Sequence, residues 1–485
     1  MEKSLVLEKY PDYRMDIGIE VHVQLNTKSK IFCSCSNDLT QQPNAHICPV
    51  CAGHPGVLPV LNQQVVESAI KAGLGTNCTV SEISEFDRKH YFYPDLPKNY
   101  QITQNYFPIC KSGHLMIRLE DGTEKKIRIN RIHIEEDAGK NMHSDITGES
   151  YVDLNRTGTP LLEIVSEPDI ENAAEAKAYL KALRLVMQYV GVSDCNMEEG
   201  SFRADTNVSV RKKDSQELGT RCELKNINSF KFISDAIEYE VERQITALES
   251  GQRIRQETRL WDSKNRRSIS MRSKEDLADY RYCTDPDLSL IQVTPQKLQE
   301  TKTVMPELPY DKYHRYINQW GLTPYEADVV TADIESTRYF EAAMAVYPKK
   351  SVVNWFLRDI LGYVNDTKIT LSECPITPVF LAKLVRMLDE SVINNTAAKE
   401  VFETIAQTGQ DPELIVEQKG LKQIGSADEL EKIVLQVLQE NPALIEQYKA
   451  GKQNVFGFFV GACMKATGGK GNPKILQEML KKHLQ

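Results

Sequence analysis

Three short apolar runs in the first 170 residues of the chain carry acidic side chains within them or directly after them. The runs are Ile17–Val23, Ile127–Ile134 and Leu161–Val165. Their polar residues are Glu20, His22, Glu135, Glu136, Asp137 and Glu163. Carboxylates on apolar strands are costly to bury unless a cation or a proton offsets their charge. The pattern indicates either a hard-cation site for Mg²⁺ and nucleotide phosphates or acids on the solvent side of half-buried strands, which strand alternation readily produces.

The rest of the region up to about residue 290 is rich in short β-branched runs, glycines and turn dipeptides. Two segments have apolar residues at helical spacing and predict helices, one over 173–190 and one over 229–248. This mixture predicts an α+β domain with a mostly antiparallel sheet.

A proline-rich joint between Pro286 and Pro309 ends the strand signals. Helical patterns follow, including Thr323-Pro324, a capping residue before a proline at the first helical position, and a helix around 352–361. We therefore expect an N-terminal α+β domain of residues 1–292, called the cradle below, a helical domain of residues 293–410 and a small helical tail of residues 411–485.

Composition narrows the class of protein. The chain has 485 residues, of which 41% are hydrophobic and 26% charged, which is ordinary for a globular protein. No apolar run approaches the ~20 residues of a membrane span, and the first residues lack a signal-peptide pattern. We expect a cytoplasmic protein. The net charge of −9 argues against a nonspecific DNA coater.

Four of the eleven cysteines are grouped as Cys33-Ser-Cys35 and Cys48-Pro-Val-Cys51. Two thiolate pairs at this separation can close a tetrahedral Zn²⁺ site, and the second pair suits a knuckle turn. Because four sulfur ligands leave no open position, such a zinc ion would be structural. His46 and His54 are alternative ligands.

The tail is basic although the chain as a whole is acidic. Its last 37 residues hold seven lysines and one glutamate. Lys465, Lys470 and Lys474 flank the glycines at 468, 469 and 471 in a loop that can place amides and lysines on phosphates. A helical tail with solvated lysines is the alternative.

Segment 86–104 mixes cations, aromatic rings and amides, among them Arg88, Lys89 and Tyr91. Such interleaving suits a nucleoside or an unpaired RNA end, although core tyrosines would give the same pattern.

Seven motifs, in order from about residue 14 to the end, resemble GatB, the family of tRNA-dependent amidotransferase B subunits. They are Gly18-Ile-Glu-Val-His-Val23, Arg88-Lys-His-Tyr-Phe-Tyr-Pro-Asp-Leu-Pro97, Ile134-Glu-Glu-Asp-Ala-Gly-Lys140, Asp153-Leu-Asn-Arg-Thr-Gly-Thr-Pro-Leu-Leu-Glu163, Met197-Glu-Glu-Gly-Ser-Phe-Arg-Ala-Asp205, Glu223-Leu-Lys-Asn-Ile-Asn-Ser229 and Phe459-Val-Gly-Ala-Cys-Met-Lys-Ala-Thr467. Cys283 and Thr284 depart from the family pattern, and the four cysteines occur in only part of the family.

The resemblance implies an ATP-dependent ligase that converts misacylated Glu-tRNA(Gln), Asp-tRNA(Asn) or both to the amide. An amidase A subunit would supply ammonia from glutamine, and a small C subunit would brace the assembly. The GatB chain would use ATP and Mg²⁺ to phosphorylate the side-chain carboxylate, and its YqeY-like tail would bind tRNA. We identify no amidase serine–lysine apparatus in this chain, so ammonia would come from elsewhere.

The resemblance also implies a set of site residues. The expected catalytic residues are Glu20, His22, Glu135, Glu136, Glu163 and Asp205. Of these, Glu20, His22, Glu135 and Glu163 are the expected Mg²⁺ ligands, and Glu136, Asp205 and Glu199 are alternative or outer ligands. The nucleotide-binding candidates are Arg88, Lys89, Tyr91, Arg156 and Arg203. The tRNA-binding candidates are Lys465, Lys470 and Lys474.

Two other functions use the same residues. A metal-dependent hydrolase or nuclease would need a metal-bound water as nucleophile, and a nonenzymatic RNA-binding scaffold would need the cysteines and the tail alone. ATP consumption that depends on misacylated tRNA would separate the ligase from both.

Overall fold

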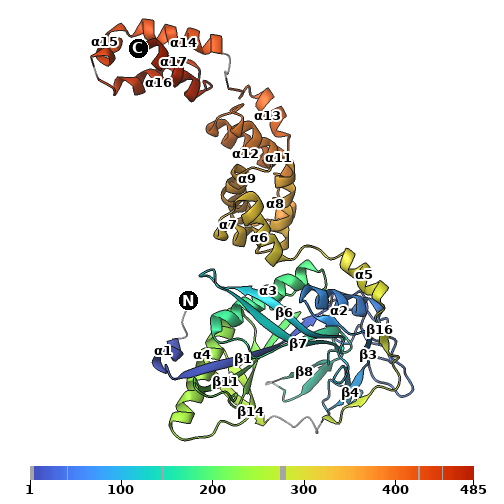
Figure 1. The fold of residues 1–485 in the computed structure, drawn as a ribbon. Coiled ribbons are helices and arrows are strands. Elements are labelled where there is room, and N and C mark those ends of the chain that lie inside the picture. Colours follow the sequence, from blue (N-terminus) through green and yellow to red (C-terminus); the bar gives the residue numbers. More distant parts are fainter. Residues whose placement is uncertain are drawn as a thin grey trace. The chain divides into compact units, whose positions relative to one another are not determined.

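The computed structural model describes residues 5–40, 42–144, 147–273, 280–423, 427–450 and 452–484. Its contacts divide the chain into two compact units, Met1–Tyr310 and Asp311–Gln485 (Figure 1). The first unit holds the described strands together with five helices, and the second unit is helical.

A nine-stranded sheet forms the centre of the first unit, with the order β14-β13-β12-β11-β1-β10-β7-β6-β2. Neighbouring described strands pair antiparallel apart from β12 and β13, which are parallel. From one edge to the other the strands are β14 (Arg267–Ser273), β13 (Glu257–Asp262), β12 (Cys222–Ile227), β11 (Phe202–Lys212), β1 (Tyr13–Gln24), β10 (Pro160–Ser166), β7 (Glu124–Glu136), β6 (Cys110–Arg118) and β2 (Thr79–Val80).

Helices cover one face of this sheet. They are α2 (Gln63–Gly75), α3 (Ala173–Tyr189) and α4 (Phe230–Glu249), and they contact one another and strands β6, β7 and β11. In β1 the residues Ile17, Ile19 and Val21 are fully buried. Because side chains alternate along a strand, Glu20 and His22 lie on the opposite face. The site residues are therefore on the face that these helices do not cover.

Smaller elements complete the first unit. Three strands form a sheet in the order β15-β4-β5, and two further pairs of strands are β16-β3 and β8-β9. Their bounds are β3 (Ile83–Ser84), β4 (Asp87–His90), β5 (Tyr100–Thr103), β8 (Lys140–His143), β9 (Ser150–Asp153), β15 (Cys283–Thr284) and β16 (Ile291–Gln292); helices α1 (Leu5–Lys9) and α5 (Pro295–Thr303) lie near the two ends of the unit's sequence.

The second unit contains two hydrophobic cores, one formed from residues 313–416 and one from residues 430–484. The first core belongs to α6 (Pro309–Trp320), α7 (Pro324–Thr331), α8 (Ile334–Val346), α9 (Lys350–Trp355), the π-helix η2 (Phe356–Ile360), α10 (Leu361–Thr367), η3 (Leu371–Glu373), α11 (Pro378–Asp389), α12 (Asn395–Thr408) and α13 (Pro412–Gln418). The second belongs to α14 (Ala427–Glu440), α15 (Pro442–Lys449), α16 (Val455–Ala466) and α17 (Pro473–Leu484).

The architecture confirms the predicted α+β class with a mostly antiparallel N-terminal sheet. The two predicted cradle helices are α3 and α4, and Thr323 forms the capping box of α7. The helix expected around 352–361 is present as the consecutive elements α9, η2 and α10. Its middle part, η2, is π-helical, and the Leu361 amide donates to the Phe356 carbonyl. The division at residues 292 and 410 stays a prediction. Within the described ranges, no helix is both long enough and apolar enough to cross a membrane.

Candidate metal and nucleotide site

Four neighbouring strands place polar residues on the uncovered face of the sheet. His22 on β1 lies opposite Glu163 on β10, and Glu163 lies opposite His133 on β7. Glu135 follows His133 by two residues and therefore shares its face. The register thus brings together side chains that are far apart in the sequence.

His22, Glu135 and Glu163 converge closely enough to hold a metal ion. One ligand atom from each lies within 4.8 Å of the others. His22 Nε2 is 3.3 Å from Glu135 Oε1 and 3.5 Å from Glu163 Oε2. His133 Nε2 lies 3.1 Å from Glu163 Oε2. The sequence patterns did not single out His133, although its position two residues before Glu135 on a predicted strand was the available signal.

The carboxylates and imidazoles of this cluster stabilise one another's charged forms. Burial alone would raise the pKa of Glu135, but hydrogen bonds from His133 and His22 lower it to about 2. The pKa of Glu163 falls well below its usual value because His133 and His22 outweigh the burial effect. Burial alone would lower the pKa of His133, but Glu163 and Glu135 raise it to about 9. The two imidazoles thus favour the ionised form of both carboxylates.

This donor set fits a divalent cation. In nucleotide sites Mg²⁺ usually takes one or two protein carboxylates, and waters and substrate phosphates complete its shell. Glu135 and Glu163 provide two such carboxylates. His22 adds an imidazole, which transition metals bind more readily than Mg²⁺ does.

Glu20 and Asp205 lie beside the cluster. They face each other across β1 and β11, and Asn207 Nδ2 donates to Glu20 Oε1 at 2.9 Å. Asp205 pairs with Lys225 at 2.6 Å. Burial alone would lower the pKa of Lys225, but Asp205 and Glu223 raise it above its usual value. Glu20, an expected ligand, and Asp205, an alternative ligand, therefore lie beside the three-residue group and not within it. Glu199 is exposed in a turn.

Arg156 and Arg203 meet at Asp137, a residue to which the sequence patterns gave no separate role. Arg203 Nη2 lies 2.8 Å from Asp137 Oδ2, and Arg156 Nε lies 3.4 Å from the same oxygen. Arg156 also donates to the carbonyls of Ala138 and Gly139, at 3.0 and 2.7 Å. Arg203 lies opposite His22 in the register, so this pair extends the site along β11.

Lys89 and Tyr91 form an aromatic–cation group with Tyr280. The Lys89 ammonium lies 4.7 Å from the centre of the Tyr280 ring and 5.9 Å from that of Tyr91. Burial alone would lower the pKa of Lys89, but nearby groups including Tyr282, Glu135 and Glu163 raise it. This group is therefore electrostatically coupled to the carboxylates of the metal cluster.

The other two candidates in this area are held by specific partners. Arg88 pairs with Asp285 and Asp287 at 2.8 and 2.7 Å. Glu136 points away from its neighbour Glu135, forms an ion pair with Lys98, and accepts a hydrogen bond from the Ile102 amide at 2.9 Å.

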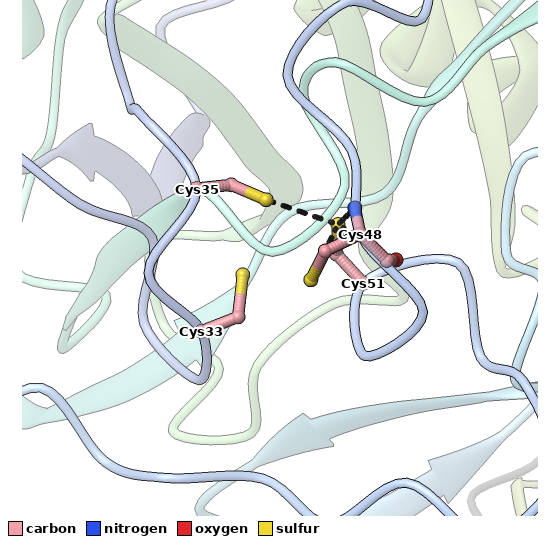
Figure 2. Close-up of side chains that lie close together, drawn as sticks. All are labelled: Cys33, Cys35, Cys48 and Cys51. Atoms are coloured by element: carbon pink, nitrogen blue, oxygen red, sulfur yellow. Dashed lines mark hydrogen bonds between the residues drawn. The ribbon is translucent and has the colours of Figure 1, made fainter.

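The predicted cysteine quartet also converges, as Figure 2 shows. Sulfur atoms of Cys33, Cys35, Cys48 and Cys51 all lie within 4.8 Å of one another. The Cys48 amide donates to Cys51 Sγ at 3.1 Å, which is the geometry of the predicted knuckle. The quartet could hold a metal ion such as Zn²⁺. The ring of His46, an alternative ligand, lies 3.1 Å from the Asp38 carbonyl instead.

Interactions within the quartet favour one thiolate. A hydrogen bond from Cys33 is the main cause that lowers the pKa of Cys51 to about 4, and the Lys30 ammonium contributes. The pKa of Cys33 rises because the Cys33 thiol donates a hydrogen bond to the Cys51 sulfur. The contacts of Cys51 therefore favour its thiolate, the form of cysteine that binds metal ions.

The candidate RNA-binding lysines of the tail are solvent-exposed. Lys465 lies in the last turn of α16, and Lys470 and Lys474 follow the turn formed by Gly468 and Gly469. Both glycines have positive φ angles, of 59° and 78°, which a glycine adopts without strain.

Comparison with known proteins links these features to one family. Residues 15–299 match the model of the GatB/GatE catalytic domain, and residues 338–484 match that of the GatB domain. The chain is 50% identical over 471 residues to the B subunit of the aspartyl/glutamyl-tRNA(Asn/Gln) amidotransferase of Persephonella marina, covering 96% of this chain and 99% of the relative. The protein of the same name from Geotalea daltonii is 50% identical, with 98% and 100% covered.

Proposed function

The chain belongs to the GatB/GatE family, and from this premise we propose that it is the B subunit of a glutamine-dependent tRNA amidotransferase. Its substrates are Glu-tRNA(Gln), Asp-tRNA(Asn) or both, and its products are the corresponding Gln-tRNA(Gln) and Asn-tRNA(Asn). The relatives carry both tRNA species in their names. The convergence of His22, Glu135 and Glu163 supports this function most directly, because the three residues could hold the cation that phosphoryl transfer requires.

The reaction requires activation because a carboxylate has no good leaving group. An oxygen of the side-chain carboxylate attacks the γ-phosphorus of ATP, the bond to the bridging oxygen breaks, and ADP leaves. Ammonia then attacks the carbonyl carbon of the acyl phosphate, loses a proton and expels inorganic phosphate. Phosphoryl transfer of this kind depends on positioning and on cations.

The residues of the site divide this work. Glu135, Glu163 and His22 would hold Mg²⁺, with Glu20 and Asp205 beside them. The bound ion would neutralise phosphate charge and align the phosphate oxygens. Arg156, Arg203 and Lys89 provide cationic side chains for the phosphates, and Tyr91 provides an aromatic ring near Lys89. Arg88 is held by ion pairs with Asp285 and Asp287 and is a further candidate for nucleotide binding.

Other parts of the chain provide binding and support. The cysteine quartet holds a structural Zn²⁺, since four sulfur ligands leave no position open for chemistry. Lys465, Lys470 and Lys474 contact tRNA phosphates. An amidase A subunit supplies ammonia, a small C subunit joins the amidase to this chain, and the assembly works in the cytoplasm.

The deciding experiment uses the reconstituted three-subunit complex with Glu-tRNA(Gln) and Asp-tRNA(Asn) in separate reactions. We expect ATP consumption only with a misacylated tRNA, together with amide formation on that tRNA. ATP-independent cleavage of the tRNA would instead support a metal-dependent hydrolase. Tight tRNA binding without ATP consumption would support a nonenzymatic scaffold, and either result would contradict the proposal.

A further inference from the structure

Lys30 is a lysine buried beside the cysteine quartet, with none of its surface exposed. An ammonium group without partners is costly in the interior of a protein. Its Nζ donates to the His46 carbonyl at 2.7 Å and to the Leu154 carbonyl at 3.4 Å, and it lies 3.7 Å from Cys51 Sγ. The lysine therefore joins the loop of the quartet to a turn that is more than 100 residues away in the sequence.

The negative charge of a zinc-loaded quartet explains why the cationic side chain of Lys30 is buried beside it. Four thiolates around one Zn²⁺ leave two negative charges, and the structure buries Cys51 almost completely. An ammonium near a thiolate stabilises the charged form, most strongly where water is excluded. Lys30 meets this need at the most buried of the four sulfur ligands.

The Leu154 carbonyl, which accepts a hydrogen bond from Lys30, precedes the turn that carries Arg156. Gly158 packs against Lys30, since a Cβ at this position would lie 3.6 Å from Lys30 Cδ and 3.7 Å from Cys51 Cβ. The Ile31 amide donates to the Gly158 carbonyl at 2.9 Å, and the Gly158 amide donates to the Asp137 carbonyl at 3.0 Å. A continuous set of contacts thus leads from the sulfur atoms to Asp137, where Arg156 and Arg203 meet.

We propose that Lys30 is a positioning residue whose ammonium offsets the charge of the metal-loaded quartet and fixes the turn from Leu154 to Gly158, so that zinc holds Arg156 in place. This inference rests on the proposed zinc site. It assigns the zinc loop an effect on the nucleotide site that does not require any contact between zinc and nucleotide.

The experiment compares Lys30→Met with Lys28→Met in the full-length protein. Lys28 is exposed and lies two residues away, so its change is a matched control. We expect Lys30→Met to release zinc to a chromogenic chelator at least about 10-fold faster, the range seen when groups that support metal ligands are removed. Hydrogen exchange should also accelerate at the Thr157 and Gly158 amides. Lys28→Met should change neither rate.

Two further measurements separate a charge effect from a general structural effect. Lys30→Arg keeps the charge and should restore slow zinc release, whereas equal release from the Arg and Met variants would overturn the proposal. If Lys30→Met does not fold, the wild-type chain provides the test, because removal of zinc should accelerate exchange at the same two amides.

The possible failures are distinguishable. A wild-type chain that lacks zinc by elemental analysis would remove both the zinc site and the role of Lys30. A zinc-loaded Lys30→Met protein with wild-type release and exchange rates would remove the role of Lys30 alone and leave the zinc site standing.

Discussion

Glu163 occupies the centre of the carboxylate–imidazole cluster, because it approaches both His22 and His133. The change Glu163→Gln keeps the size of the side chain but removes the charge that a divalent cation requires. We expect tRNA-dependent ATP turnover to fall by about 100-fold or more, the loss seen when one group aimed at developing charge is removed. Glutamine hydrolysis by the partner amidase should remain measurable.

A matched control for this change is Glu167→Gln. Glu167 follows β10 by one residue and accepts a hydrogen bond from Asn130 at 2.7 Å, outside the cluster. Both variants are assayed for ATP consumption and amide formation in the reconstituted complex. Wild-type amide formation by Glu163→Gln would contradict the assignment of the site.

His133 provides a second test at this scale, because it contacts Glu163 and Glu135 without belonging to the three-residue group. Removing a residue that orients metal ligands typically weakens metal binding by about 10- to 100-fold. We expect His133→Asn to weaken Mn²⁺ binding by about 10-fold, measured by electron paramagnetic resonance of the free ion. His143→Asn, a change at an exposed histidine on β8, should have no effect, and equal Mn²⁺ affinities of both variants would refute the role of His133.

The Asp169–Arg128 pair predicts a pH dependence of stability. Partial burial alone would raise the pKa of Asp169, but hydrogen bonds from the side chain and the amide of Arg128 lower it. A lowered pKa stabilises the fold above the unfolded value of about 3.9, and this contribution is lost as the pH falls through the folded value. Asp169→Asn should therefore lower the melting temperature by about 2 °C at pH 7, and the difference should shrink below about pH 4.

Differential scanning fluorimetry between pH 7 and pH 3 measures this dependence. Asp214→Asn is the control, since Asp214 lies exposed in a turn. If the difference in melting temperature between Asp169→Asn and the wild type stays constant over this pH range, the pair does not act through ionisation of Asp169.

At the scale of secondary-structure elements, the sequence predicted the features that depend on residues close together in the chain, such as the positions of helices. Apolar spacing predicted α3 and α4 to within one residue at each end, and the structure shows that Asn172 and Ser229 cap them. Strand order depends on contacts between distant segments, and local patterns do not encode it. Thus the pairing of β10 with both β1 and β7, which brings His22, Glu135 and Glu163 together, became visible only in the structure.

The site shows the same limit. The carboxylates were predicted because each lies within an apolar run or directly after one, and because they match the motifs of the family. His133 and Asp137 obtain their roles from the strand register and from Arg203. The cysteine quartet was predicted because its spacing alone restricts the geometry. The buried position of Lys30 depends on the turn after Leu154, which no local pattern connects to the quartet.

The cysteine loop can be tested as an element. Cys48→Ser removes one of four sulfur ligands, so we expect well under one zinc per chain by elemental analysis. Faster proteolysis between residues 33 and 60 should accompany the loss, because the metal crosslinks the two halves of the loop. The rate of amide formation should change less than the rate of proteolysis of the loop, since a four-sulfur site has no open position for chemistry.

Cys283→Ser provides the control for the cysteine experiment. Cys283 is exposed and lies outside the quartet, so its replacement should leave zinc content and proteolysis unchanged. Full zinc content in Cys48→Ser, measured without added metal, would contradict the four-sulfur site.

At the scale of the whole molecule, the two hydrophobic cores of the helical unit determine where a truncation can be made. Ile415 and Val416 of α13 are buried in the first core, so a cut at residue 411 would expose that core. A cut before α14 at residue 427 retains α13 and removes the second core as a whole. The shorter deletion therefore removes the tail and keeps the first core whole, although it also removes the hydrogen bond that Asn394 Nδ2, at the start of α12, donates to the Gly469 carbonyl.

Deleting residues 427–485 should raise the KM for charged tRNA and reduce its dependence on salt. Lysines that neutralise phosphates release counterions, and each lost contact reduces the slope of log affinity against log salt by about 0.9. Replacement of Lys465, Lys470 and Lys474 by Gln in the full chain should reduce the slope by about 2 to 3, while replacement by Arg should preserve it. Glutamine hydrolysis should persist in every variant, because that chemistry belongs to the amidase. If the Gln variant retains both the wild-type KM and the wild-type salt slope, these lysines form a solvated surface and the tRNA is held elsewhere.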